Sequence, residues 1–175
     1  MAPVPPLVAE ATKKSGLLWI AIRGQPRRFA VWHVWRDDSA YIVTGPGEQP
    51  APALAEAAIC DVTVRSTDKG GRIVTWRAVV SRVEPDSDAW KEVVPSLLAG
   101  RLNLTGASDA EERWAAECHV LRLAPTGELV EAGDTLPTGS LAAPPPPSPA
   151  RTTSRIPFTL GGRRRRRAGR SDGHR

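Results

Sequence analysis

The sequence is poor in cysteine and contains no long apolar run. Cys60 and Cys118 are its two cysteines among 175 residues, and neither belongs to a Cys-x-x-Cys pair. Isolated cysteines of this kind are typical of buried free thiols, so we expect neither a zinc site nor a disulfide framework. No segment reaches the ~20 apolar residues of a membrane-spanning helix, and the N-terminal stretch is not apolar enough for a signal peptide. We therefore expect a cytoplasmic protein with no metal site and no membrane span.

Patterns that would indicate hydrolytic chemistry are also missing. The sequence shows no Ser-His-Asp arrangement and no conspicuous pair of carboxylates, so hydrolase activity has no support. There are three histidines, and His119, at the start of a predicted strand, is expected to be structural.

Charge is distributed unevenly along the chain. Residues 1–136 carry 15 Lys and Arg against 18 Asp and Glu, a net charge of −3, whereas residues 137–175 carry nine Arg and one Asp, a net charge of +8. The basic end contains LAAPPPPSPARTTSR and GGRRRRRAGRSDGHR, whose compositions predict disorder. We predict a folded domain over residues 1–134 and a disordered tail over residues 135–175. The tail is either solvated or contacts a polyanion, such as nucleic acid or an anionic membrane surface.

The folded part combines short β-rich runs with a few helical segments. The turn RDDS between two such runs predicts a hairpin, and Ser108 with Glu111 predicts a capped helix start. Pro95 should kink or divide the helix that contains it. Strands are predicted over residues 17–23, 28–35, 40–44, 59–65, 72–83 and 119–123, and helices over residues 4–14, 51–58 and 88–102 and from residue 108. This order predicts a mainly β fold with flanking helices, a six-stranded antiparallel barrel.

The strand predicted over residues 28–35 is apolar on both faces, with His33 set between two tryptophans. Alternation places Trp32 and Val34 on one face and His33 and Trp35 on the other. A half-exposed strand would alternate apolar and polar residues, so something must cover both faces. A monomer would expose one of them as an aromatic patch, which predicts a homodimer formed across this strand.

Several stretches of the chain resemble a known family. RFAVWH, AYIVTG and DVTVRSTDKGGRIVTWRAVVSRVEP, in this order, are similar to the pyridoxamine 5′-phosphate oxidase-like proteins, the FMN-binding split-barrel family. The resemblance implies a six-stranded split β-barrel, usually a homodimer, that binds a flavin, a deazaflavin or haem in a groove at the dimer interface. It also implies that the outer face of the strand over residues 28–35 meets the partner subunit and the flavin ring.

The resemblance also points to individual residues. Arg28 falls where the family places a basic residue that reaches the cofactor phosphate, and His33 falls where it places a lysine. Thr44 ends a strand at the position that faces the flavin tail. On the residues alone, a histidine at position 33 is more often a satisfied groove or interface residue than a flavin contact, and Trp32 is more often a core or dimer-interface aromatic than a stacking group.

The loop after this strand departs from the family pattern. The family carries Ser-Arg-Lys there, whereas this chain carries Glu48 and Gln49, and Glu48 would repel a phosphate of about −1.5 to −2 charge. The resemblance then leaves Arg28, the loop amides and an arginine from elsewhere, such as Arg77 or Arg65, to meet the phosphate. Arg77 is equally suited to pairing with a carboxylate. The cofactor-binding candidates are Arg28, Trp32, His33, Thr44, Gly45, Gln49 and Arg77.

Two functions fit these observations. The first is a flavin-binding split-barrel protein, an FMN- or deazaflavin-dependent oxidoreductase of unknown substrate in which the ring supplies the redox chemistry. The second is a non-catalytic split-barrel dimer whose basic tail tethers it to nucleic acid or another polyanion. The pattern at His33 and Thr44 favours the first, and the substitution at Glu48 and Gln49 favours the second.

Overall fold

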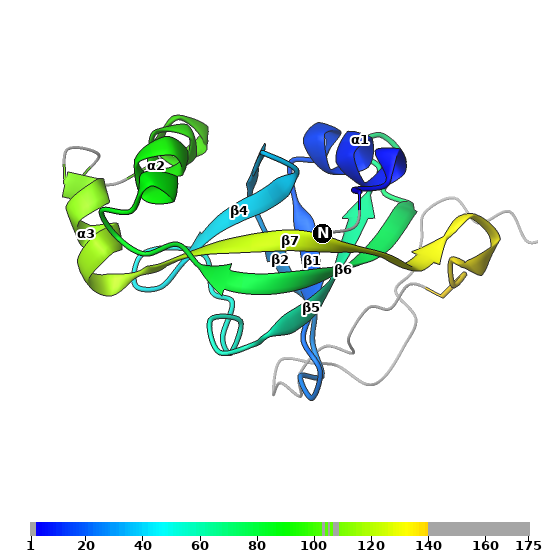
Figure 1. The fold of residues 1–175 in the computed structure, drawn as a ribbon. Coiled ribbons are helices and arrows are strands. Elements are labelled where there is room, and N and C mark those ends of the chain that lie inside the picture. The colour runs from blue at the N-terminus through cyan, green and yellow to red at the C-terminus, as the bar shows by residue number, and fades with distance from the viewer. Residues whose placement is uncertain (1–2, 103, 105, 107–108, 140–175) are drawn as a thin grey trace, which may run out of the picture. The chain divides into compact units, whose positions relative to one another are not determined.

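The structure, a computed structural model, describes residues 3–102, 104, 106 and 109–139. Over these residues it is mainly β, with three α-helices around one sheet (Figure 1). The helices are α1 (Pro6–Lys14), α2 (Asp88–Gly100) and α3 (Ala110–Glu117), and a 3-10 turn covers Gly133–Thr135. The strands are β1 (Leu18–Ala21), β2 (Phe29–Val31), β3 (Val34–Arg36), β4 (Ser39–Thr44), β5 (Ile59–Arg65), β6 (Arg72–Arg82) and β7 (His119–Ala132).

Most of the predicted tail, residues 140–175, lies outside the described part, so its disorder and the domain boundary stay predictions. Within the described part, no helix is both long enough and apolar enough to cross a membrane.

The strands form a seven-stranded antiparallel sheet that curves into a half-barrel, in the order β2-β1-β5-β6-β7-β4-β3. The two edge strands, β2 and β3, are consecutive in the chain and are separated only by Trp32 and His33. The first half of the run predicted as one strand pairs with β1, and the second half pairs with β4. This break accounts for seven strands where the sequence predicts six.

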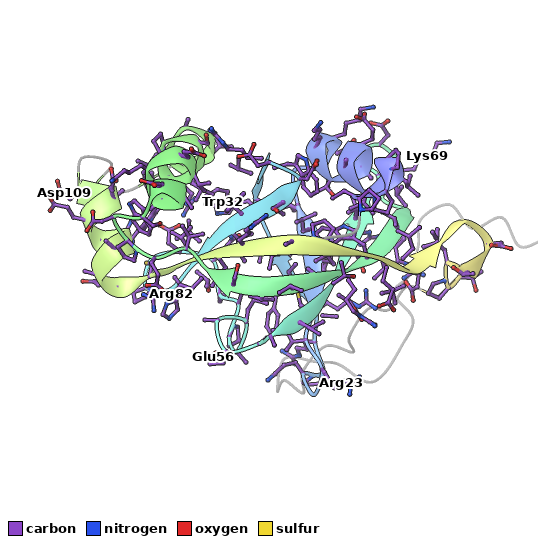
Figure 2. All side chains as sticks on the ribbon, in the orientation of Figure 1. Arg23, Trp32, Glu56, Lys69, Arg82 and Asp109 are labelled. Atoms are coloured by element: carbon purple, nitrogen blue, oxygen red, sulfur yellow. The ribbon has the colours of Figure 1, made fainter. Side chains whose placement is uncertain are left out.

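Side chains on either side of the break alternate as predicted, but the second face is covered differently. Val31 and Trp35 join the barrel core, where Trp35 meets Trp76 edge-on with 6.3 Å between ring centroids. Trp32 and Val34 pack into a second cluster formed with α2 and α3, and Figure 2 shows Trp32 beside α2. Helices of the same chain thus cover the Trp32 and Val34 face in part, and contact of this run with a partner subunit stays a prediction.

Helix α2 continues through Pro95, so of the two predicted effects, a kink or a division, the division is wrong and the kink stays a prediction. The side chain of Ser87 caps the helix by accepting from the amide of Trp90 at 3.1 Å. Its buried residues, Trp90, Val93, Val94 and Leu97, recur at helical spacing and face the second cluster. Pro95 is exposed, so the carbonyl that its ring leaves without a partner can be hydrated.

Two helix predictions have other outcomes. Residues 51–58 form turns instead of a helix: Ala53 adopts a φ of +63°, which a right-handed helix excludes, and the segment is anchored by the fully buried Leu54. The predicted cap at Ser108 lies outside the described residues. The described helix α3 begins after Asp109, whose side chain makes no capping bond.

Candidate functional site

The seven predicted cofactor residues lie in three places that share no hydrogen bond. Four lie at the seam between β2 and β3 or in the loop that follows β4, one lies beneath α1, and two lie on the outer face of the sheet. The seam and the loop hold Trp32, Thr44, Gly45 and Gln49, the position beneath α1 holds His33, and the outer face holds Arg28 and Arg77. The structure thus does not gather them into a single groove.

At the seam, the Gln49 side chain takes the place of a neighbouring strand. Its amide nitrogen donates to the Trp32 carbonyl at 2.9 Å, and its amide oxygen accepts from the Trp32 N–H at 2.7 Å. The Thr44 hydroxyl donates to the Gln49 carbonyl at 3.0 Å and accepts from the Ala51 amide at 3.3 Å. The chain itself therefore satisfies the backbone groups of Trp32, as buried backbone groups require, whereas the buried Trp32 Nε1 has no partner among the described residues.

The side chain of Glu48 is fully buried and contacts residues of α3 and of the end of α2. Its Oε2 accepts from Arg101 Nε at 2.9 Å, and its Oε1 accepts from Arg113 Nη2 at 3.2 Å and from Trp114 Nε1 at 2.9 Å. The expectation that Glu48 faces and repels a phosphate is therefore wrong, because two arginines neutralise it inside the fold. Sequence reasoning missed both arginines, which lie 53 and 65 residues further along with no local signal.

Two glycines let the loop after β4 approach α3. Gly45 has a φ of +140°, and a Cβ there would lie 2.9 Å from the Cα of Cys118. Gly47 has a φ of +74°, and a Cβ there would lie 3.0 Å from Arg113 Nη1. Between them, the Pro46 carbonyl accepts from Arg113 Nη1 at 3.1 Å. A side chain at Gly45 would collide with the backbone of Cys118, whereas one at Gly47 would be strained by the positive φ and would require the guanidinium of Arg113 to shift.

His33 lies beneath α1 and not at an open groove. Its Nε2 is 3.1 Å from the carbonyl oxygen of Thr12 in that helix. A carbonyl only accepts, so this bond requires the proton on Nε2. Its Nδ1 is buried with no partner among the described residues. Burial lowers the pKa of His33, and the bond to Thr12 opposes this only in part. The histidine in the apolar run thus ties the seam to α1.

On the outer face, Arg28 begins a line of hydrogen bonds across the sheet. Its Nη1 donates to Thr63 Oγ1 at 2.6 Å, Thr63 and Thr75 are bonded at 2.9 Å, and Thr75 donates to Glu131 Oε2 at 2.9 Å. Both threonines are buried. Among the described residues, no carboxylate lies within ion-pair distance of Arg28. Its charge therefore remains available to an anion.

Arg77 is paired with two carboxylates and lines a hollow of about 680 Å³. Its Nε lies 3.1 Å from Asp61 and its Nη1 lies 2.8 Å from Glu128. Of the two partners considered for Arg77, a phosphate or a carboxylate, the described structure contains the carboxylate. The walls of the hollow are mostly aliphatic, from the end of β1, residues 57–58 and the start of β5, with Arg23, Asp61 and Arg77 as charged groups. Figure 2 shows Arg23 at this end of the sheet.

The hollow and Arg28 belong to the same face of the sheet. Thr63, the partner of Arg28, stands two residues from Asp61 on β5, so their side chains project to one side. A volume of this size lies within the ~300–1,000 Å³ of small-molecule sites. The outer face therefore carries a hollow and a cation that has no carboxylate partner in the described part of the chain. At the seam, by contrast, the side chains of Gln49 and Thr44 are bonded within the chain.

Thiol and metal chemistry find no site in the described part of the chain. Both cysteines are free and buried, and burial raises the pKa of Cys60 to about 12, which keeps its thiol protonated at neutral pH. No group of three or more His, Cys, Asp or Glu side chains in this part could hold a metal ion.

The strand order defines the fold as a mainly β half-barrel whose edge strands are two halves of one run. No family model and no curated protein matches the chain. Solved structures do resemble it. HutZ, the haem storage protein of Vibrio cholerae, is 16% identical with a TM-score of 0.48, covering 73% of this chain and 94% of that chain. The FAD and haem binding protein of Mycobacterium smegmatis is 19% identical with a TM-score of 0.46, covering 70% and 66%.

A third solved structure carries the name of the family that the sequence resembles. It is described as a "putative pyridoxamine 5′-phosphate oxidase" from Listeria innocua, is 10% identical and has a TM-score of 0.47, covering 70% of this chain and 94% of that chain. These three TM-scores lie below 0.5, so the description of the fold rests on the strand order and not on the likenesses.

Proposed function

We propose that this chain is a flavin-binding protein that holds FMN on the outer face of its half-barrel. The phosphate binds Arg28, and the ring lies over the hollow beside Arg77. The observation that carries the proposal is the guanidinium of Arg28, which has a hydroxyl but no carboxylate as its partner in the described structure, next to a hollow of suitable size. The choice of a flavin follows the sequence resemblance.

The residues on this face suit the two ends of such a ligand. Arg28 uses one N–H for Thr63 and keeps further donors for phosphate oxygens, and a charge-assisted hydrogen bond contributes roughly 1.5–3 kcal/mol. The aliphatic walls suit a flat ring, and Asp61 and Arg77 offer an acceptor and donors to its polar edge. The flavin would supply the redox chemistry of an oxidoreductase, while the chain binds, orients and shields it. A deazaflavin phosphate would use the same contact at Arg28.

A second copy of the chain belongs to this proposal. Ile59 and Val79 are cross-strand partners on β5 and β6, and they are 51% and 46% exposed. An exposed β-branched pair on the face that carries the hollow is the kind of surface that a partner subunit covers. This replaces the aromatic run of residues 29–35 as the reason to expect a homodimer.

Titration with two flavins tests the proposal. FMN should bind, and Arg28→Ala should weaken it at least tenfold, because one charge-assisted bond corresponds to about one to two decades in Kd. Riboflavin has no phosphate, so Arg28→Ala should change its Kd much less. The matched control is Arg27→Ala, which removes the exposed neighbouring arginine. Equal binding of the two flavins with no effect of Arg28→Ala would place the phosphate elsewhere, and no binding of either would refute the flavin proposal.

The second candidate function is a non-catalytic half-barrel with a basic tether. The observation that favours it is the seam, where the hydroxyl of Thr44 and the side-chain amide of Gln49 are bonded within the chain. The full chain should then adsorb to heparin or DNA at low salt and be released as salt rises. Removal of residues 140–175 should abolish the adsorption. If the full chain does not adsorb at low salt, the tether idea is excluded.

A further inference from the structure

The side chains around Glu48 have the composition of a binding site for an oxyanion. Arg101, Arg113 and Trp114 direct three N–H donors at the two carboxylate oxygens, over distances of 2.9–3.2 Å. Charge-assisted bonds from two arginines and an indole N–H are the donors that proteins use for carboxylates and phosphates. Two cations face one anion here, so these groups together keep a positive charge.

The same arginines are open to solvent on their other side. The side chain of Glu48 has no exposure, whereas those of Arg101 and Arg113 keep 24% and 27%. A hollow of about 350 Å³ lies against them, bounded also by Pro46, Gly47, Leu104 and the exposed Glu117. An ion from solvent can thus reach both guanidinium groups without crossing the core, and Glu117 is the carboxylate that it meets at the rim.

Glu48 reaches the arginines from a loop and not from a strand or helix. Gly45 and Gly47 precede it, both with positive φ, and glycine moves between such backbone conformations at low cost. On its other side, Gln49 anchors the chain to Trp32. The carboxylate is therefore a tethered occupant. To withdraw it, the loop must break the bond from the Glu48 amide to the Gly45 carbonyl (3.1 Å) and the bond from Arg113 to the Pro46 carbonyl (3.1 Å), neither of which belongs to the pairing of β4.

We propose that Arg101, Arg113 and Trp114 form an oxyanion-binding site that Glu48 occupies from within, so that the phosphate or carboxylate of a ligand competes with Glu48 for it. A group on a short tether has an effective concentration in the millimolar range, so self-occupancy weakens the apparent affinity for outside anions. Arg28 is not part of this site, and the inference does not depend on flavin binding.

Anion titrations of full-length Glu48→Ala and Glu48→Gln test the proposal, with tryptophan fluorescence and Tm as readouts. Phosphate and acetate are titrated separately against chloride at equal ionic strength, which distinguishes phosphoryl from carboxylate recognition. At least one of the two anions should bind Glu48→Ala with an apparent Kd at least tenfold lower than in the unsubstituted chain. Adding Arg113→Gln to Glu48→Ala should remove the response. Glu56→Ala, at an exposed carboxylate shown in Figure 2, should respond like the unsubstituted chain.

Each outcome bears on the proposal. If Glu48→Ala folds only when acetate or phosphate is added, that rescue supports the site, and Glu48→Gln, which keeps the side-chain shape, is used for the titration. If neither variant responds to either anion beyond the effect of chloride, the proposal is overturned. It is also overturned if the response survives Arg113→Gln, or if the unsubstituted chain binds the anions as tightly as Glu48→Ala.

Discussion

Thr63 donates its hydroxyl hydrogen to Thr75, and their neighbours determine this direction. The two oxygens are 2.9 Å apart, and either could be the donor on distance alone. The hydroxyl of Thr75 donates its hydrogen to the carboxylate of Glu131, so it can only accept from Thr63. Arg28 can only donate, so Thr63 accepts from it and keeps its own hydrogen for Thr75. A cation and a carboxylate are thus joined across the sheet by hydrogen bonds that all point one way.

Thr75→Val should lower the free energy of unfolding by about 1–3 kcal/mol. The substitution keeps the side-chain shape and removes the bonds of Thr75 to Thr63 and to Glu131 at a site that is 1% exposed. The hydroxyl hydrogen of Thr63 then loses its acceptor, while the bond from Arg28 to Thr63 remains. Urea unfolding measures the change, and Thr67→Val, at an exposed position, should be close to neutral. Equal stability of the two variants would mean that the line of hydrogen bonds contributes nothing.

Gln49→Ala should destabilise the seam. Loss of both bonds to Trp32 leaves the N–H and carbonyl of a broken strand without a partner, which should cost about 1–3 kcal/mol in urea unfolding. Hydrogen exchange at the Trp32 amide should accelerate as well. Gln25→Ala, in an exposed turn, is the control. An unchanged exchange rate at Trp32 would argue against the two bonds between the Gln49 side chain and the Trp32 backbone.

Stability should fall below pH 6.5 because of His33. Burial lowers its pKa in the folded state below the ordinary 6.5, so the unfolded chain binds more protons in the interval between the two values. The stabilisation that neutral His33 provides is fully present above pH 6.5 and is lost as the pH falls through that interval. Below the folded-state pKa of His33, the free energy of unfolding no longer changes on account of this residue. His33→Gln should flatten this part of the curve in urea unfolding between pH 8 and pH 5. An identical slope in both proteins would contradict the assignment.

Ile59→Lys should dissociate the proposed dimer. The chain should sediment as a dimer at micromolar concentration. A lysine at position 59, beside the exposed Val79, would place a charge in the apolar interface and should shift the chain to the monomer. Leu7→Lys, at a 43% exposed position on α1, should leave the dimer intact. If the unsubstituted chain is a monomer at that concentration, the homodimer is excluded.

The sequence predicts most of the fold because the strands carry local signals. The β-rich runs that become β4, β5 and β6 are bounded by turn residues and match the structure to within about one residue. The break at Trp32 could not be foreseen, because it depends on Gln49, whose side chain meets the strand only after the sheet curves. Local propensity was also misleading at residues 51–58, where burial of Leu54 and the φ of Ala53 prevail over a helix-forming composition.

The contacts of the candidate residues could be predicted from the sequence only in part. Arg28 was selected from the family resemblance as a basic residue at the start of a strand. In the described part of the chain its charge has no carboxylate within ion-pair distance, and its contact with a phosphate stays a prediction. The charge on Glu48 was misjudged, because its partners Arg101 and Arg113 come from helices far along the chain. Pairing across such distances is a property of the tertiary fold, and no spacing rule in the sequence encodes it.

The break between β2 and β3 also limits the addition of a foreign β-strand to the edges of the sheet. Each of these edge strands has three residues, and Gln49 occupies both backbone groups of Trp32 between them. A foreign strand needs a long row of open N–H and carbonyl groups to add to a sheet, and very short edge strands deny it one. The bend that closes the half-barrel thereby also makes its rim a poor template for fibril growth.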